Sequence, residues 1–177
     1  MKIAKTSFKD LIIIKNKSYK DKRGYFKELL RENEIRIKFP FLVMSYSKKN
    51  VIRGLHLQQR KSQGKFVTVI KGKIYDVVID LRKRSKTFGK IYSIILSKKN
   101  ALGLFIPAGF AHGYFSYDKE NIIYYKLDNY YAPKFESGII YNDSSIDFKW
   151  PKKKMTISQK DRDLPSFVQF KKKLKFL

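Results

Sequence analysis

Cysteine is absent from this chain of 177 residues, and histidine occurs only twice. The lack of cysteine excludes a disulfide framework and a thiolate metal site, and it fits a reducing compartment. The N-terminal region has an apolar patch of only four residues, 11–14, which is too short for a signal-peptide core or a membrane span. We therefore expect a soluble, cytoplasmic protein.

Acidic residues are also scarce. The chain has 15 Asp and Glu against 40 Lys and Arg, which gives a net charge of +25. Such a charge favours nucleic acid, anionic membranes or phosphorylated ligands as partners. Lysine is spread along the whole chain, however, and with the abundant Ile, Asn, Tyr and Phe this is typical of codon usage in an AT-rich genome. We expect neither a nucleic-acid nor a membrane partner.

Apolar and aromatic residues are plentiful: 43% of the chain is hydrophobic, with 14 Phe and 12 Tyr. This supports one folded domain over residues 1–177 with a real core. Short β-rich runs separated by turn residues predict strands every eight to twelve residues, which is typical of a β-sandwich or barrel. The expected strands are 11–14, 24–29, 41–46, 51–57, 65–71, 73–80, 90–96, 102–106, 112–117, 121–127 and 138–141.

Helices are expected to be few, with one over residues 27–38 and short pieces near the C-terminus. The segment "DVVIDLR" at 76–82 is apolar between two aspartates and predicts a central strand buried on both faces. The tail "FVQFKKKLKF" at 167–176 could form a basic amphipathic helix that touches a membrane. We favour a helix that packs Phe167 and Phe170 on the barrel and leaves its lysines in water.

The two histidines lie in separate predicted strands. His112, in "IPAGFAHGYF", follows a tight Pro-Ala-Gly turn and resembles the second half of a cupin signature. Metal-binding cupins add a His-x-His pair and a Glu, but here His56 is followed by Leu57 and Gln58. Two histidines without a paired carboxylate make a poor metal site, so we expect none. Each could be a half-buried structural imidazole, but together they indicate a shared cavity.

The segment "NVIRGLHLQQRKSQGK" at 50–65 is unusually polar for a strand. A small barrel has room for one ligand, and a wall of Arg53, His56, Lys65 and His112 suits an anionic or enolisable one. Strict alternation would place Arg53 and His56 on opposite faces. We expect Gly54 to supply a bulge or kink that turns both inward.

A set of short motifs along the chain resembles those of a known enzyme family. In chain order they are "RGYFKE" (23–28), "VIRGLHLQ" (51–58), "QGK" (63–65), "DVVIDLRKRSKTFGK" (76–90), "IPAGFAHGY" (106–114), "YYKLDNYYAP" (124–133), "YND" (141–143), "WP" (150–151) and "SQKD" (158–161). Together they resemble the dTDP-4-dehydrorhamnose 3,5-epimerase family over roughly residues 8–165. The resemblance implies a mostly β fold, a double-stranded β-helix (cupin or jelly-roll barrel) with a few short helices.

The resemblance also implies a reaction. The enzyme would invert carbon 3, carbon 5 or both in a nucleotide-linked 4-keto-6-deoxy sugar, as in the conversion of dTDP-4-dehydro-6-deoxyglucose to dTDP-4-dehydrorhamnose. Both hydrogens lie next to the ketone and are therefore acidic. No cofactor is implied. The family further suggests a homodimer in which the "RGYFKE" strand lines the partner's site.

By resemblance, His56 is the base, and Asp161 holds its far nitrogen and stabilises the imidazolium. Tyr125 is the acid that returns a proton to the opposite face. Asp161 could instead be a helix cap, with Asp163 as the partner, and Tyr125 could be simple strand packing. The remaining expected substrate contacts are Lys65 and His112 at the enolate oxygen, Arg23 and Arg53 at the phosphates and sugar, Glu28 at a sugar hydroxyl, and Tyr131 near the ligand.

The chain departs from the family in one strand. Family members commonly show a Gln and an Asn where "FLVMSYSKK" has Phe41 and Val43. Two polar contacts are therefore replaced by apolar groups, so a mono-epimerase or a ketoisomerase for another dTDP-, GDP- or CDP-linked sugar is a second hypothesis. A third is a non-catalytic barrel that binds polyanions. That hypothesis requires His56 to be packed and inaccessible, whereas the enzyme requires His56, Tyr125 and Asp161 to meet in one cavity.

Overall fold

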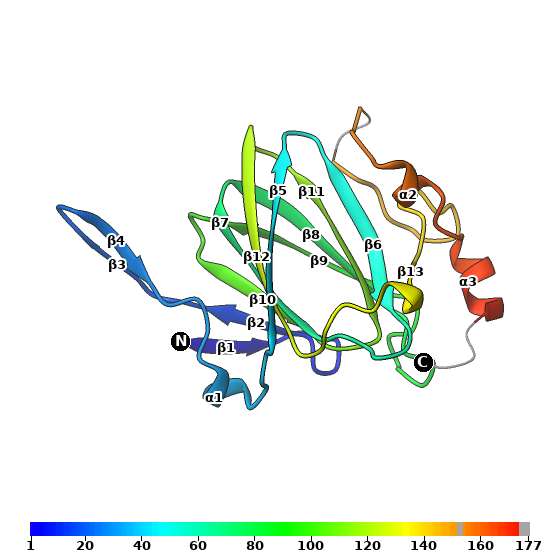
Figure 1. Cartoon of the computed structure of the whole chain (residues 1–177), viewed down its shortest axis with the longest axis horizontal. Coiled ribbons are helices and arrows are strands. Elements are labelled where there is room, and N and C mark those ends of the chain that lie inside the picture. Colours follow the sequence, from blue (N-terminus) through cyan, green and yellow to red (C-terminus); the bar gives the residue numbers. More distant parts are fainter. Residues whose placement is uncertain (152–153, 174–177) are drawn as a thin grey trace.

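The computed structural model describes residues 1–151 and 154–173, and it consists mainly of two antiparallel sheets that face each other (Figure 1). The six-stranded sheet has the order β1-β2-β10-β7-β12-β5, and the five-stranded sheet has the order β13-β6-β11-β8-β9. The strands of these sheets are β1 (Lys2–Lys5), β2 (Ile12–Lys15), β5 (Phe41–Lys48), β6 (Ile52–Gln58), β7 (Lys65–Lys71), β8 (Lys73–Asp80), β9 (Ile91–Ser97), β10 (Leu102–Ile106), β11 (Phe110–Ser116), β12 (Glu120–Leu127) and β13 (Glu136–Gly138). The expected β-barrel class is confirmed.

The main core lies between the two sheets. Val67 and Val69 of β7 and Leu104 of β10 point inward from one sheet, and Val78 of β8 and Phe110 of β11 do so from the other. All five are at most 1% exposed. Alternation of apolar and polar residues along the strands accounts for this packing, because successive side chains leave a strand on opposite faces.

A second apolar layer covers the outer face of the five-stranded sheet. Val77 and Ile79 of β8 pack there against Phe167 and Phe170 of α3 (Phe167–Lys173). The strand "DVVID" is therefore buried on both faces, as expected, and the packing of both phenylalanines is confirmed. Part of the predicted tail, residues 174–176, lies outside the described residues.

The largest error of the sequence prediction concerns residues 27–38. Only Glu32–Ile35 form a helix, α1, because β4 (Gly24–Lys27) pairs with β3 (Ser18–Asp21) up to Lys27, and Arg36 ends the helix in the left-handed conformation with φ 55°. Strand pairing thus overrides local helix propensity. Two further helical turns complete the described elements, η1 (Pro133–Phe135) and α2 (Gln159–Arg162).

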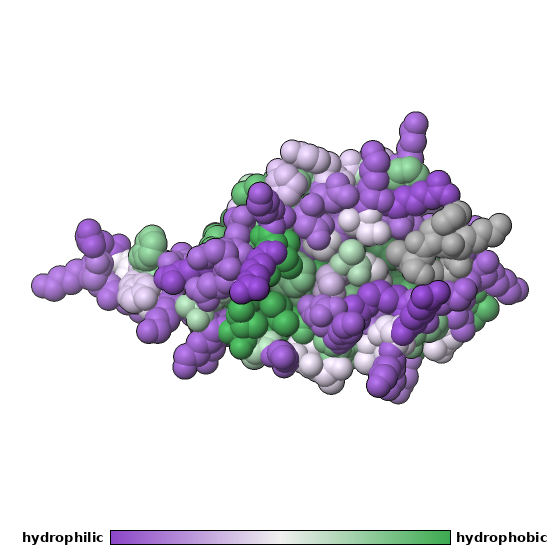
Figure 2. All heavy atoms as spheres, turned by 90° about the horizontal axis from the view of Figure 1, so that it is seen from below, coloured by the Kyte–Doolittle hydropathy of each residue, from purple (hydrophilic) through white to green (hydrophobic). Residues whose placement is uncertain are grey.

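The β3–β4 hairpin projects from the body (Figure 1, left). Its aromatic residues contact little else: Tyr19, Tyr25 and Phe26 are 54%, 47% and 67% exposed. In the view from below, hydrophilic side chains cover the hairpin tip, and an apolar area lies on the part of the body nearest to it (Figure 2). An arm this exposed gains little stability from its own chain.

A very close approach of two strands shapes the cavity wall. The pairing of β6 with β11 shifts register between His112 and Tyr114, opposite Gly54, which has φ 111°. A Cβ on Gly54 would lie 2.6 Å from both the Cα of Gly113 and the carbonyl oxygen of His112. Only glycine fits there, and the irregularity lets Arg53 and His56 face the same cavity, as expected.

Replacing Gly54 with alanine should therefore destabilise the protein more than replacing Gly24. Both glycines have positive φ, but a Cβ on Gly24 has nothing within 4 Å. Overpacking of a tight site adds about 1–3 kcal/mol to the backbone strain that both variants share. Urea unfolding of G54A and G24A measures the difference, and equal loss of stability would contradict the close-packing argument.

Candidate functional site

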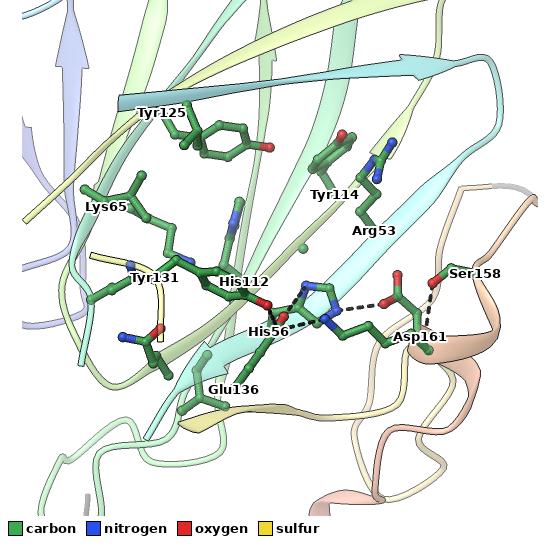
Figure 3. A pocket seen from close by; sticks show the side chains of 17 residues that line it. Arg53, His56, Lys65, His112, Tyr114, Tyr125, Tyr131, Glu136, Ser158 and Asp161 are labelled. Carbon is green, nitrogen blue, oxygen red and sulfur yellow. Dashed lines mark hydrogen bonds and ion pairs between the residues drawn. The ribbon is translucent and has the colours of Figure 1, made fainter. Parts of the chain in front are cut away.

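A cavity of about 360 Å³ opens between the two sheets, and side chains from both of them line it (Figure 3). The five-stranded sheet contributes Arg53, His56 and His112, while the six-stranded sheet contributes Lys65 and Tyr125. The other expected residues at the cavity, Tyr131 and Asp161, come from the loop after β12 and from α2. A polar set of this kind in a half-enclosed apolar wall is typical of a small-molecule site.

His56 and Asp161 form a closely held pair. The His56 Nε2 lies 2.7 Å from Asp161 Oδ1, and the other carboxylate oxygen accepts a 3.1 Å hydrogen bond from the Gly54 backbone N–H. The Ser158 side chain caps α2 by accepting a hydrogen bond from the Asp161 backbone N–H. This contact fixes the position of the Asp161 backbone, from which the carboxylate extends toward His56. Asp163, the other candidate, instead accepts from Gln159.

The ionised carboxylate sets the tautomer of the imidazole. Burial alone would raise the pKa of Asp161, but the hydrogen bonds from His56 and Gly54 hold this pKa below its ordinary value. An ionised Asp161 accepts a hydrogen bond from Nε2–H, so the lone pair of neutral His56 lies on Nδ1, which faces the cavity (Figure 3). The geometry is that of a base oriented by a carboxylate.

Two charged residues that line the cavity with His56, Glu136 and Lys160, were not predicted from the sequence. Glu136 Oε1 lies 3.9 Å from His56 Nδ1, and Glu136 Oε2 accepts from Lys160 Nζ at 2.7 Å and also from the Tyr131 hydroxyl. Burial would raise the pKa of Glu136, but the Lys160 and Tyr131 hydrogen bonds and the nearby His56 lower it overall. Lys160 stands next to Asp161 in "SQKD" and could have been inferred; Glu136 carries no sequence signal of its own.

Gln58 holds the loop that carries Tyr131. The Gln58 Oε1 accepts from the Ala132 N–H at 2.8 Å, and its Nε2 donates to the Tyr130 carbonyl at 3.3 Å. The loop is thereby tied to the end of β6, two residues after His56. Tyr131 itself is 49% exposed, so its ring is available to a ligand at the mouth of the cavity.

Lys65 and His112 lie deeper. His112 Nε2 is 2.9 Å from Oδ2 of Asp76, a fully buried aspartate whose other oxygen has no partner among the described residues. Burial lowers the pKa of the Lys65 ammonium, and the carboxylates of Asp76 and Glu136 offset only part of this effect. A protonated Lys65 can stabilise negative charge that develops on a bound ligand, and His112 can do so in its imidazolium form, in which Nε2–H faces Asp76 and Nδ1–H is left to donate.

Tyr125 lies across the cavity from His56 (Figure 3). Burial and the neighbouring Tyr114 raise the pKa of the Tyr125 phenol well above its ordinary value, against the lowering effect of a hydrogen bond with Ser45 at 3.2 Å. The phenol is therefore protonated at neutral pH. In the register of β5 and β12, its neighbour across the ladder is Val43, which lines the same cavity.

Two residues that were expected to contact the substrate, Arg23 and Glu28, do not line the cavity of the chain to which they belong. Arg23 sits in the turn of the β3–β4 hairpin and pairs with Asp21 at 2.6 Å, with 91% of its side chain exposed. Glu28 follows β4 and pairs with Arg31 at 2.8 Å. The hairpin extends outward instead of folding back over the barrel (Figure 1), so a contact of Arg23 or Glu28 with a bound ligand stays a prediction that requires a second copy of the chain.

Neither a metal cluster nor a membrane helix is found in the described part of the chain. No group of three or more histidine, aspartate and glutamate side chains there could hold a metal ion. Among residues 1–151 and 154–173, no helix has the length and apolar character needed to cross a bilayer.

Comparison with known proteins identifies the family. The family model for dTDP-4-dehydrorhamnose 3,5-epimerase matches residues 5–169. This chain belongs to the dTDP-4-dehydrorhamnose 3,5-epimerase family. The family member from Methanothermobacter thermautotrophicus is 42% identical over 167 residues, which cover 90% of each protein.

Solved structures of family members agree with the fold. The dTDP-6-deoxy-D-glucose-3,5-epimerase of Legionella pneumophila, in complex with dTDP-4-keto-L-rhamnose, has a TM-score of 0.92 and 36% identity, with 98% of this chain and 96% of that chain covered. The dTDP-4-dehydrorhamnose 3,5-epimerase of Bacillus anthracis, with TDP and PPi bound, has a TM-score of 0.90 and 37% identity, with 94% and 99% covered. The resemblance drawn from the ordered motifs is confirmed.

The His56–Asp161 contact yields a direct prediction for this epimerase-family site. In D161N the amide would present an N–H to Nε2 and force the proton onto Nδ1, where the lone pair is needed. We expect proton abstraction from a bound ketone to slow by roughly 10³-fold or more, as when the orienting aspartate of a triad is changed. D163N is the matched control on the same helical turn and should retain activity. Similar losses in both variants, with intact circular dichroism, would contradict the assignment.

Proposed function

We propose that this chain epimerises a dTDP-linked 4-keto-6-deoxy sugar at carbon 3, carbon 5 or both. One observation carries the proposal: a histidine oriented by a carboxylate and a protonated tyrosine lie on opposite sides of one cavity, with a lysine and a second histidine also in its wall (Figure 3). The family supports an isomerase, and the Legionella and Bacillus relatives hold a dTDP-linked keto sugar and TDP.

The first step removes a proton next to the ketone. The Nδ1 of His56 takes the hydrogen of carbon 3 or 5, and the electron pair moves into the ring to form an enolate. The Asp161 carboxylate stabilises the imidazolium through Nε2. Lys65 and His112 face the developing negative oxygen, where a donor in a dry site has most effect. All groups are side chains of the protein, and the step uses no cofactor.

Inversion requires a proton from the opposite side of the sugar ring. Tyr125 projects from the sheet facing the one that carries His56, so a ring bound between them exposes one face to each. The phenol donates its proton to the carbanionic carbon, and a phenolate remains. General acid–base catalysis of this kind typically contributes about 10²–10⁴-fold.

The nucleotide would lie toward the mouth of the cavity. Arg53 and Lys160 supply positive charge for a pyrophosphate, and the exposed ring of Tyr131 can stack on a base. The forked guanidinium of Arg53 is already held by the Ser47 hydroxyl and the Tyr46 carbonyl, both at 3.0 Å. Holding it in place lowers the entropic cost of binding a phosphate.

Val43 supports the second hypothesis, an enzyme that acts at one carbon or on another 4-keto sugar. It lines the cavity beside Tyr125 and cannot hydrogen-bond a sugar hydroxyl, while Phe41 packs against Tyr130 with ring centroids 5.7 Å apart. The polyanion-binding hypothesis loses support, because its criterion was an inaccessible His56. The His56 side chain is 29% exposed and borders a cavity.

Solvent exchange tests the proposed reaction. The protein is incubated in D2O with dTDP-4-keto-6-deoxyglucose, and NMR follows the label. Deuterium at carbons 3 and 5 supports the double epimerase, and deuterium at one carbon supports the relative with a single inverted centre. Absence of label from dTDP-, GDP- and CDP-linked 4-keto sugars would refute the enzyme.

Two variants separate the proposed base from the proposed acid. H56A should reduce exchange by about 10³-fold, because the other carboxylate beside His56, Glu136, is held by Lys160 and Tyr131 and its lowered pKa makes it a weaker base. Y125F should still exchange label, since His56 can return a deuteron to the same face, but it should not invert the carbon. NMR distinguishes exchange from inversion in the same sample. Inversion by Y125F at the wild-type rate would remove Tyr125 from the mechanism.

We further propose a homodimer in which the β3–β4 hairpin of one protomer completes the site of the other. The hairpin exposes Tyr19, Tyr25 and Phe26, and the outer face of β5 exposes Leu42, Met44 and Tyr46. Apolar side chains on an arm and on an edge strand favour burial against a second copy. Arg23 and Glu28 would then reach the partner's cavity. We also still expect a cytoplasmic location, as inferred from the sequence.

Complementation tests the shared site. R23A and H56A should each be weakly active alone. After mixed refolding, half of the dimers carry one of each chain, and one of their two sites has both wild-type residues, so activity should recover to about one quarter of wild type. A mixture no more active than its components would contradict the exchange of hairpins, and sedimentation would show whether a dimer exists at all.

A further inference from the structure

A chain of hydroxyl groups connects the hidden side of Tyr125 to a second groove. The Tyr125 hydroxyl lies 3.2 Å from the Ser45 Oγ, which lies 3.0 Å from the Tyr114 hydroxyl, which in turn lies 2.8 Å from the Ser47 Oγ. The Arg53 Nε donates to the Ser47 Oγ at 3.0 Å. Four hydroxyls thus follow one another without a gap.

The positions of these residues on the strands bring the hydroxyl groups together. Ser45 and Ser47 are two residues apart on β5 and point to the same face, while Tyr114 reaches them from β11 in the opposite sheet. Tyr114 and Ser47 are each 2% exposed and Ser45 is partly buried, so little water surrounds the middle of this path. Figure 3 shows the Tyr125 hydroxyl directed toward Tyr114, with Arg53 next to it.

The far end of the row of hydroxyl groups reaches a second groove, which adjoins the cavity because Arg53 and Asp161 line both. Ser47 lines a groove of about 500 Å³ beside the proposed active cavity, together with Lys48, Lys49 and Arg53. Ser47 and Ser45 do not line the cavity that holds His56. A sugar bound in the cavity would separate Tyr125 from bulk water on that side but would leave the groove open.

We propose that Ser45, Tyr114 and Ser47 form a proton relay that reprotonates Tyr125 from groove water after each inversion. The inference rests on the proposed function. A buried phenolate is costly, and the phenol must be restored before a second carbon or a second substrate can be inverted. A tyrosine in strand packing alone would need one partner for its hydroxyl, not a continuous path to a second groove.

The proton count closes over a cycle. Inversion leaves His56 as imidazolium and Tyr125 as phenolate. Ser45 then gives its proton to the Tyr125 oxygen, Tyr114 gives one to Ser45, and Ser47 gives one to Tyr114. A groove water protonates Ser47 and becomes hydroxide, which the nearby Lys48, Lys49 and Arg53 stabilise electrostatically. The proton that leaves His56 for the solvent neutralises this hydroxide, so the enzyme returns to its starting state.

Pre-steady-state kinetics in D2O with substrate in excess tests the relay with Y114F, which removes the central hydroxyl but keeps the ring. The first inversion uses the proton already on Tyr125, so it should slow much less than later inversions, even though Tyr114 also influences the pKa of the phenol. Later inversions should slow by about ten-fold or more, because the acid is no longer restored quickly. The progress curve should therefore show a burst of one inverted, labelled carbon per active site. S45A, which removes a hydroxyl outside the cavity, should give the same burst.

Y75F is the matched control. Its hydroxyl pairs with the Ser93 Oγ at 2.8 Å in the five-stranded sheet, so Y75F breaks the same kind of tyrosine–serine contact away from the relay. No burst is expected there. If Y114F and S45A slow the first and later inversions equally, or leave both unchanged, the relay is refuted. If the wild-type protein incorporates no deuterium at all, the proposed function fails instead, and the two failures are distinct.

Discussion

The contact on which the site depends is the close approach of β6 and β11 at Gly54 and Gly113. A Cβ on Gly113 would lie 2.6 Å from the Arg53 carbonyl oxygen, so both strands need glycine at this point. The approach breaks the regular ladder and frees the Gly54 N–H to bind the Asp161 carboxylate. Just beyond it, Leu55 and Ile139 exchange backbone hydrogen bonds of 2.9 and 3.3 Å. One irregular stretch therefore sets the direction of His56 and anchors the C-terminal segment that orients it.

The two sheets divide the proposed chemistry between them. His56 belongs to the five-stranded sheet and Tyr125 to the six-stranded sheet, so a sugar ring bound between the sheets would have one group on each face. Their protonation states follow from their surroundings: an ionised aspartate leaves a lone pair on the cavity side of His56, and burial keeps Tyr125 protonated. The architecture thus places the proposed base and the proposed acid on opposite sides of the cavity.

Much of the fold could be predicted because strands are local patterns. Alternating apolar residues and turn signals located most strands, and the buried run at 76–82 became the central strand β8. The helix expected over 27–38 is confined to Glu32–Ile35, since β4, whose strand was expected from the sequence, extends to Lys27 and Arg36 ends the helix. The short strands β1 (Lys2–Lys5) and β3 (Ser18–Asp21) were missed because they exist through pairing with β2 and β4 and have little burial pattern of their own.

The sequence by itself determined the family and the residue types of the site, because ordered motifs such as "VIRGLHLQ" and "SQKD" keep their identity whatever the packing. Only the tertiary structure decided which residues meet. It joined His56 to Asp161, 105 positions apart, and not to Asp163; it brought Glu136 to the other nitrogen; and it carried Arg23 away on a projecting arm. The physical reason is that hydrogen bonds and burial depend on distances of a few ångströms in space. The number of residues between two positions in the sequence does not show whether the fold brings them that close.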